Sequence, residues 1–480
     1  MAAEWRMRNK RFSMPLAVVS ATLLVTAGCT MEPHYRRPVA PVPAAWPAVA
    51  PVPAGSANAA DVGWQSFFSD PRLKQLIALA LANNRDLRVS VARIDEARGQ
   101  HRIQRADLLP NIGASGAATR QKGLNPAGGA GGGSAPGAID VYQANVGVSA
   151  FELDFWGRVR SLNKAARESY LSTVEAERAF RISLIADVAS SYLSLLAADE
   201  GITLAENTLK SRREGLQLAD LRLKAGVTSA LDYRQTETLL TQAETELAAL
   251  RRQRAQTENA LGVLVGGPIP ADLPPPIALE KQGLDGRIGA GLPSLLLASR
   301  PDVLSAEHSL RAANANIGAA RAAFFPTINL TGAFGFASLD LENLFDKGSQ
   351  AWNYGGTLSL PLFDFGRNKA NLDVAKARNN IAVATYEKAI QTAFREVADA
   401  LAARRFLAEQ VAAQTRALAA QRDLAELAEL RYRNGVANYL EVLDAQRNLF
   451  SAEQALVQSR SDQQANLVAL YVALGGGVNP

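Results

Sequence analysis

The chain contains one cysteine and three histidines among its 480 residues, so few of the side chains that build metal centres or disulfide frameworks are present. The histidines, His34, His101 and His308, show no metal-ligand spacing, and no Gly-x-Ser-x-Gly or Walker-type motif occurs. We therefore expect no enzyme and no metal site. After residue 28 there is no run of eighteen consecutive apolar residues, which argues against a membrane-spanning helix.

Aromatic residues make up only 6% of the chain, and the formal net charge is +5. Four basic residues and one acidic residue among the first 28 supply +3 of this charge, which leaves +2 (5 − 3) for the remainder. A nearly neutral body gives no electrostatic reason to expect nucleic acid as a partner. Hydrophobic residues at 48% and abundant alanine favour a folded protein made mainly of closely packed helices.

The most informative feature of the sequence is an internal repeat. The segment LRLKAGVTSALD beginning at Leu221 recurs as LRYRNGVANYLE at Leu430, 209 residues later. The segment RADLLP ending at Pro110 recurs as RAAFFP ending at Pro326. Two halves in the same order indicate a duplicated architecture. We assign the first repeat to residues 61–265, an irregular crossover to 266–292, the second repeat to 293–475 and a short tail to 476–480.

The N-terminus has the features of a targeting signal. Residues 1–28 carry a basic stretch, then an apolar stretch and small residues, as a secretory signal peptide does. Cys29 follows directly in a setting that resembles a bacterial lipobox, which implies covalent diacylglycerol and N-acyl chains on Cys29. The alternative is an ordinary cleaved signal that leaves an unmodified cysteine. The proline-rich residues 29–60 predict an extended tether, with the folded body beginning near Trp64.

Each half is expected to contain one helix, two strands, a very long helix and a returning helix. Residues 70–108 read as a single helix, and the pattern from Gly157 to about Leu223 contains no proline and only two glycines. The same pattern runs from Phe365 to Tyr432. Residues 231–264 and 440–474 are the expected antiparallel partners of these long helices. Helices of this length exceed globular norms and suggest a coiled-coil-like assembly.

Strict alternation of apolar and small polar residues predicts four strands. The strands lie near residues 111–120, 141–153, 327–337 and 352–362. Such alternation is what a transmembrane β-barrel requires, with lipid outside and water inside, although a soluble sandwich would show the same pattern. Four strands cannot close a barrel, and an open edge in lipid would leave backbone groups unpaired. If the strands span a membrane, several protomers must therefore share one barrel.

Over nearly the whole mature chain, the sequence resembles the TolC-like outer membrane factors, in their lipidated (NodT/OprM-like) efflux branch. The motifs that carry the resemblance are Cys29, YRRP at residue 35, RPD at 300, AAFFP at 322, PLFDFG at 361 and the paired Gly-Val turns. The resemblance implies a mixed α and β membrane protein that forms a homotrimer. Its twelve-stranded β-barrel would cross the outer membrane, and its long-helix α-barrel would form a periplasmic tunnel.

The resemblance also implies which residues carry the function. The turns at Gly226-Val227 and Gly435-Val436 would contact a periplasmic adaptor protein, unless they are merely helix-hairpin turns. Asp232, Tyr432, Glu441 and Asp444 would form a periplasmic gate, with Arg431, Arg433 or Arg222 as basic partners. Acidic residues in a first helical turn are also ordinary helix caps, so both interpretations remain open at this stage.

The function indicated is the outer membrane channel of a tripartite efflux pump, which passively conducts small molecules such as drugs. The implied partners are a periplasmic adaptor and an inner-membrane transporter of the RND type. The alternatives are a duct for type I protein secretion or for metal-ion efflux, and, more distantly, a coiled-coil surface protein. The last of these does not explain paired strands at matched places in two halves.

Overall fold

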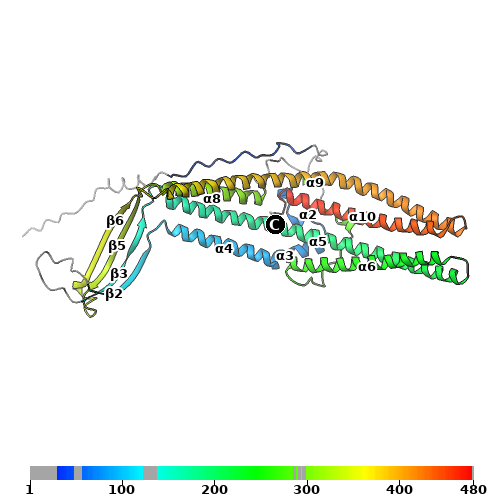
Figure 1. Cartoon of the computed structure of the whole chain (residues 1–480), viewed down its shortest axis with the longest axis horizontal. Coiled ribbons are helices and arrows are strands. Elements are labelled where there is room, and N and C mark those ends of the chain that lie inside the picture. Colours follow the sequence, from blue (N-terminus) through cyan, green and yellow to red (C-terminus); the bar gives the residue numbers. More distant parts are fainter. Residues whose placement is uncertain are drawn as a thin grey trace, which may run out of the picture. The chain divides into compact units, whose positions relative to one another are not determined.

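The computed structural model describes residues 30–47, 57–122, 138–284, 288–289, 293 and 299–477 (Figure 1). Two compact units are present. Unit 1 contains the described part of Met1–Arg37 together with Glu96–Tyr170 and His308–Ala384, and unit 2 contains Pro38–Asp95, Leu171–Glu307 and Thr385–Pro480. Several helices contribute residues to both units. Cys29 and the glycine-rich residues 128–137 lie outside the described residues.

Unit 1 is built on one four-stranded sheet. The strands are β2 (Ile112–Gln121), β3 (Ile139–Glu152), β5 (Thr327–Ser338) and β6 (Gln350–Ser359). They pair antiparallel in the order β2-β3-β5-β6, as Figure 1 shows, so each repeat supplies one hairpin. All four strands predicted from alternation are therefore present, with ends that differ from the prediction by at most three residues.

The strand register separates the side chains into two chemically distinct faces. Opposed residues of antiparallel strands share a face, so Val146, Phe334 and Trp352 form one row. Most of the large apolar residues of the four strands lie on this face; they include Ile112, Val148, Leu330, Tyr354 and Leu358, whereas Ile139 and Val141 at the start of β3 lie on the other face. The other face carries small and polar residues, among them Ser115, Asn145, Thr331, Asn353 and Thr357.

The apolar face of this sheet is exposed in the single chain. Phe334, Trp352 and Leu358 are 59%, 68% and 70% exposed. A sandwich would bury such residues against a second sheet, but the only other pairing in the described part of the chain joins β1 (Ala57–Asn58) to β4 (Ile288–Gly289) in unit 2. The soluble-sandwich alternative is therefore wrong. An exposed apolar face beside a polar one matches a sheet with lipid on one side and water on the other.

Long helices account for most of the remaining chain. The helix α5 (Arg158–Lys224) is followed by α6 (Ala230–Val265), and α9 (Arg367–Arg433) is followed by α10 (Tyr439–Ala473). These bounds match the predicted long helices to within two residues. Figure 1 shows each pair returning through a tight turn, so that unit 2 contains two helical hairpins. The helix α8 (Pro301–Ala322) precedes β5, as the repeat predicts.

One sequence expectation about helices is wrong. Residues 70–108 form α3 (Pro71–Asn83) and α4 (Arg85–Ala106) rather than one helix. The break lies at Asn84, whose side chain accepts a hydrogen bond from the Leu87 amide and donates one to the Leu264 carbonyl. The helix α5 contains an 18-residue stretch that is long and apolar enough to cross a membrane by length and composition only, and half of this stretch is buried in the protein. That burial is typical of a core helix.

A buried polar network holds the start of α3 within unit 2. Asp70 caps α3 by accepting hydrogen bonds from the amides of Arg72 and Leu73. The same carboxylate accepts hydrogen bonds from the Tyr192 hydroxyl at 2.8 Å and the Gln282 amide at 3.0 Å. Burial and the nearby Asp70 carboxylate raise the pKa of Tyr192 above its usual range. One side chain thus joins α3, α5 and the crossover segment.

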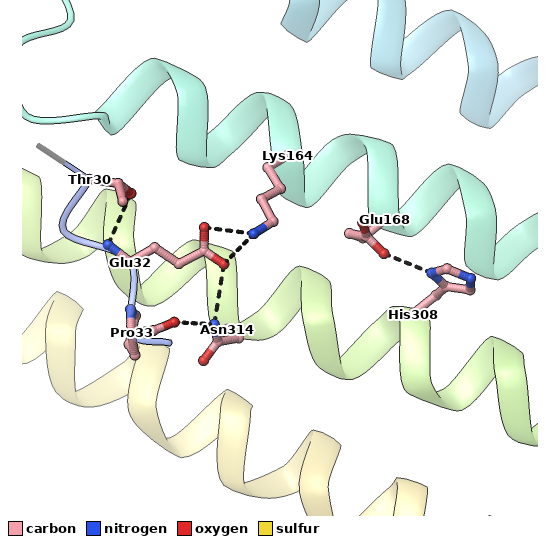
Figure 2. A network of polar contacts seen from close by, with 7 residues as sticks. All are labelled: Thr30, Glu32, Pro33, Lys164, Glu168, His308 and Asn314. Carbon is pink, nitrogen blue, oxygen red and sulfur yellow. Dashed lines mark hydrogen bonds and ion pairs between the residues drawn. The ribbon is translucent and has the colours of Figure 1, made fainter. Parts of the chain in front are cut away.

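The predicted tether does not run free of the folded body. Trp46 stacks on Phe394 with ring centroids 4.8 Å apart in unit 2. In unit 1 the Glu32 side chain is only 11% exposed and contacts α5 and α8 (Figure 2). The tether packs in an extended conformation, because proline prevents helix formation but leaves an extended chain able to pack against helices. Among the described residues, regular secondary structure begins with β1 at Ala57, and the first α-helix, α2 (Trp64–Phe67), begins at Trp64.

Candidate functional site

The two hairpin turns have the same backbone conformation. In the first turn, the Val227 amide donates to the Arg222 carbonyl and the Gly226 amide donates to the Leu223 carbonyl, both at 3.0 Å. In the second, Val436 and Gly435 donate to the equivalent carbonyls of Arg431 and Tyr432. This is the Schellman arrangement, which needs a left-handed residue after the helix. Gly226 and Gly435 have φ values of +73° and +71°, which explains both glycines.

The valine after each glycine is exposed. Val227 is 72% exposed and Val436 is 67% exposed. In a Schellman turn this residue usually packs back onto the helix that it follows. Each hairpin turn therefore presents one exposed apolar side chain that is accessible to a partner protein. Their contact with an adaptor stays a prediction.

Asp232 has a local structural role in the first turn. Ser229 caps α6, and the Asp232 carboxylate accepts hydrogen bonds from the Ser229 amide at 3.3 Å and the Thr228 hydroxyl at 2.9 Å. These hydrogen bonds lower the pKa of Asp232 below its ordinary value, and the hydrogen bond from Thr228 has the largest effect. The structure thus places Asp232 in a capping box, where its carboxylate accepts hydrogen bonds from its own turn. Its role as a gate residue remains a prediction.

The second turn arranges its acidic residues differently. Asn438 caps α10 by accepting from the Glu441 amide, while the Glu441 carboxylate lies 3.7 Å from Arg431 on α9. Asp444 pairs within its own helix with Arg447 at 2.8 Å. All four charged side chains are about half exposed. Of the three proposed basic partners, Arg431, Arg433 and Arg222, only Arg431 forms an ion pair with the carboxylate of a predicted gate residue, Glu441.

Tyr432 joins the two hairpins through its ring. The Arg222 guanidinium lies 4.8 Å from the centre of the Tyr432 ring, and the Tyr439 ring is 4.9 Å from it. Arg222 therefore contacts the aromatic gate residue rather than an acid. The remaining proposed partner, Arg433, pairs with Glu429 within α9 at 2.9 Å.

Sequence reasoning missed a contact of a buried arginine between the two hairpins. Arg212 on α5 is 5% exposed, and its Nη1 donates to Gln446 Oε1 on α10 at 2.7 Å. Burial lowers the pKa of Arg212. A nearby glycine gave a usable signal, because glycine inside a helix usually has a packing reason. A Cβ on Gly215 would lie 3.1 Å from the Tyr439 hydroxyl, which shows that α5 and α10 approach closely there.

The described residues contain no group of three or more His, Cys, Asp or Glu side chains suited to hold a metal ion. His101 stacks on Tyr170, and His308 pairs with Glu168 at 2.7 Å. Each of these two histidines therefore has a packing or pairing role within unit 1.

The sequence profile described as outer membrane efflux protein matches residues 76–267 and 292–476. The chain belongs to the outer membrane efflux protein family. It is 47% identical over 465 residues to the probable efflux pump outer membrane protein TtgC of Pseudomonas putida, covering 96% of this chain and 95% of that protein. It is 44% identical to outer membrane protein OprJ of Pseudomonas aeruginosa, with coverages of 98% and 97%.

Solved structures of bacterial membrane proteins share this fold. A membrane protein from Pseudomonas aeruginosa matches with a TM-score of 0.85 and 43% identity, covering 94% of this chain and 98% of that one. The open state of the MtrE outer membrane channel of Neisseria gonorrhoeae matches with a TM-score of 0.84 and 40% identity, covering 94% and 99%. The TolC-like resemblance and the expected fold are confirmed. The chain is an outer membrane channel component and not an enzyme.

Proposed function

We propose that three copies of this chain form the outer membrane exit duct of a tripartite efflux pump. The duct would carry small organic molecules passively from a periplasmic adaptor and an inner-membrane transporter of the RND type to the exterior. Relatives at 45–47% identity are named as antibiotic, toluene and solvent efflux pump proteins, which supports this substrate class.

One observation supports the assembly most directly: the sheet is amphipathic and open. Its apolar face is exposed, and β2 and β6 are edge strands in the described part of the chain. In lipid, an unpaired strand edge leaves several backbone donors and acceptors without partners, each costing several kcal/mol. Pairing β6 of one copy with β2 of the next removes both edges. With three copies, the result is a closed barrel of twelve strands.

The proposal assigns roles to both ends of the protein. Cys29 would carry a diacylglycerol and an N-acyl chain, which together hold a protein to a bilayer durably. The hairpin turns, with Val227 and Val436 exposed, would contact the helices of the adaptor. Tyr432, Glu441 and Asp444 would close the periplasmic end of the duct, and Asp232 would support the turn beside them.

Transport can be tested in a Gram-negative host that lacks its own outer membrane efflux channel. The chain is produced together with the adaptor and transporter encoded nearest to its gene, and accumulation of a fluorescent dye is measured. We expect dye accumulation to fall, and a Gly226→Asp variant of the turn to abolish this effect while still reaching the membrane. If no dye is exported, export of a co-expressed secreted protein would instead indicate a duct for type I secretion. Resistance to metal ions without dye export would indicate a duct for metal-ion efflux.

The trimer can be tested separately by crosslinking. Each variant carries one added cysteine in β2 and one in β6. Disulfides between the β6 cysteine of one copy and the β2 cysteine of the next should give a closed trimer on denaturing gels. Crosslinked dimers without any trimer would contradict the shared barrel.

A further inference from the structure

The segment that follows Cys29 packs along α8 in unit 1. Asn314 Nδ2 donates to the Pro33 carbonyl at 2.9 Å, and Arg321 Nη1 donates to the Met31 carbonyl at 3.4 Å. The Arg311 guanidinium lies 5.2 Å from the centre of the Tyr35 ring. Three positions of α8 within residues 311–321 thus hold three positions of this segment. We call residues 30–37 the strap.

Glu32 makes the strongest contacts of the strap. Its two carboxylate oxygens lie 2.8 and 3.0 Å from Lys164 Nζ on α5, and one of them accepts a hydrogen bond from Asn314 Nδ2 at 3.2 Å (Figure 2). The Glu32 side chain is 11% exposed and Asn314 is 8% exposed. A carboxylate this well buried is unfavourable without a matched cation and donor. The contacts therefore select a carboxylate at this position of the strap.

The helix surface beneath Glu32 is shaped for the strap. A Cβ on Gly318 would lie 2.9 Å from the Glu32 Cα and 2.8 Å from Ser161 Oγ, closer than side-chain carbons approach such atoms. Glycine at position 318 is therefore needed for the strap backbone to reach the surface formed by α5 and α8.

The strap runs antiparallel to α8. From Met31 to Tyr35 an extended chain advances about 13 Å, and from Arg321 back to Arg311 a helix advances about 15 Å, so the two lengths match. The beginning of the strap consequently lies beside the last turn of α8, which ends at Ala322 just before β5 starts at Thr327. Cys29 precedes Met31 by two residues in the sequence, and two residues of chain reach at most about 7 Å.

We propose that Glu32 docks the strap onto α5 and α8 and thereby fixes the lipid attachment point at the boundary between α8 and β5. The acyl chains and the sheet then enter the same leaflet of the outer membrane at one level. This inference rests on the proposed lipidation of Cys29 and on the proposed membrane insertion of the sheet. Glu32 acts as a positioning residue: it holds the anchor in place and takes no part in transport.

The test uses a nitroxide spin label on His34→Cys in the full-length protein in outer membrane vesicles, because His34 is exposed in the docked strap. The label should be immobile in the parent background and mobile in Glu32→Lys, whose side chain would face Lys164. The double variant Glu32→Lys, Lys164→Glu should restore immobility. Trypsin cleavage after Arg36 should become at least about tenfold faster in Glu32→Lys and return toward the parent rate in the double variant.

Two controls separate docking from helix packing. Glu168→Gln removes the Glu168–His308 pair between the same two helices but touches no strap residue, so the label should stay immobile. Gly318→Ala combined with Ser161→Ala removes the hydroxyl that the new methyl group would meet but keeps the overlap with Glu32, so the label should become mobile.

Equal label mobility in the parent and Glu32→Lys would overturn the inference, and so would failure of the charge swap to restore immobility. Lipidation of Cys29 is tested separately by spin-labelling the parent chain, which has no other cysteine. This chain takes up no label if the Cys29 sulfur is alkylated. Dye export is measured in parallel, so a failure of the proposed transport function is distinguished from a failure of docking.

Discussion

The structure makes a quantitative prediction about which contact keeps the two hairpins of unit 2 together. Arg212 is almost fully buried and donates to Gln446 at 2.7 Å, and hydrogen bonds to a charged group contribute about 1.5–3 kcal/mol. The exposed Arg431–Glu441 pair, at 3.7 Å, contributes about 0–1 kcal/mol. The stacking of Arg222 on Tyr432 contributes about 0.5–1 kcal/mol. Of these three contacts, the buried one should therefore contribute most.

Replacing Gln446 with Leu leaves the Arg212 guanidinium buried without this acceptor. Since 1.4 kcal/mol corresponds to a factor of ten, the balance between associated and separated hairpins should shift about 10- to 100-fold in each protomer. We expect higher single-channel conductance in planar bilayers and greater sensitivity of the host to a large antibiotic such as vancomycin, which a closed duct would exclude. Gln446→Glu should have the opposite effect, because a carboxylate strengthens the pairing with Arg212.

The matched control is Gln458→Leu. Gln458 lies on the same helix, and its side chain donates to Asp462 of that helix at 2.8 Å on an exposed surface. This variant should behave like the parent protein. If Gln446→Leu also leaves conductance unchanged while Glu441→Ala raises it, the surface charges hold the hairpins and the reasoning from burial is refuted.

Three further predictions follow from the same structure. A Glu441→Ala, Asp444→Ala double variant should lose preference for cations in planar bilayers, because it removes two acidic groups per protomer; unchanged selectivity would leave them as helix caps. Gly435→Asp should give a folded trimer that exports no dye, since an L residue is strained at φ +71° and adds charge to the turn; normal export would exclude this turn as a docking surface. Asp70→Ala should lower stability by about 3–6 kcal/mol, because a helix cap is lost and two buried donors lose their acceptor, whereas Tyr192→Phe should cost about 1 kcal/mol. Thermal unfolding followed by circular dichroism measures this difference, and equal losses would contradict the central place of Asp70.

Features with a local cause could be predicted from the sequence. The strand phases were correct because a period of two is set within each strand, and the turns at Gly226 and Gly435 were correct because few residues adopt a positive φ. The break at Asn84 was missed because its cause is partly remote: the side chain donates to Leu264, 180 residues away.

Contacts between distant segments could not be predicted in the same way. Arg212 and Gln446 are 234 residues apart, and Glu32 and Asn314 are 282 residues apart. An arginine or a glutamate in an amphipathic helix or a proline-rich segment looks like any solvent-exposed residue of its type. Only the packing of the elements shows that these particular ones are buried and paired.

Equivalent acidic residues in the two repeats make different contacts. Asp232 and Glu441 occupy equivalent positions, 209 residues apart, at the third residue of a returning helix. The shorter Asp232 side chain folds back to the Ser229 amide, so its charge stabilises its own turn. Glu441 instead lies within 3.7 Å of Arg431 on the preceding helix, and this exposed pair leaves its carboxylate accessible. A carboxylate that can change partners suits a gate, so we expect Glu441 to contribute more than Asp232 to the proposed gate.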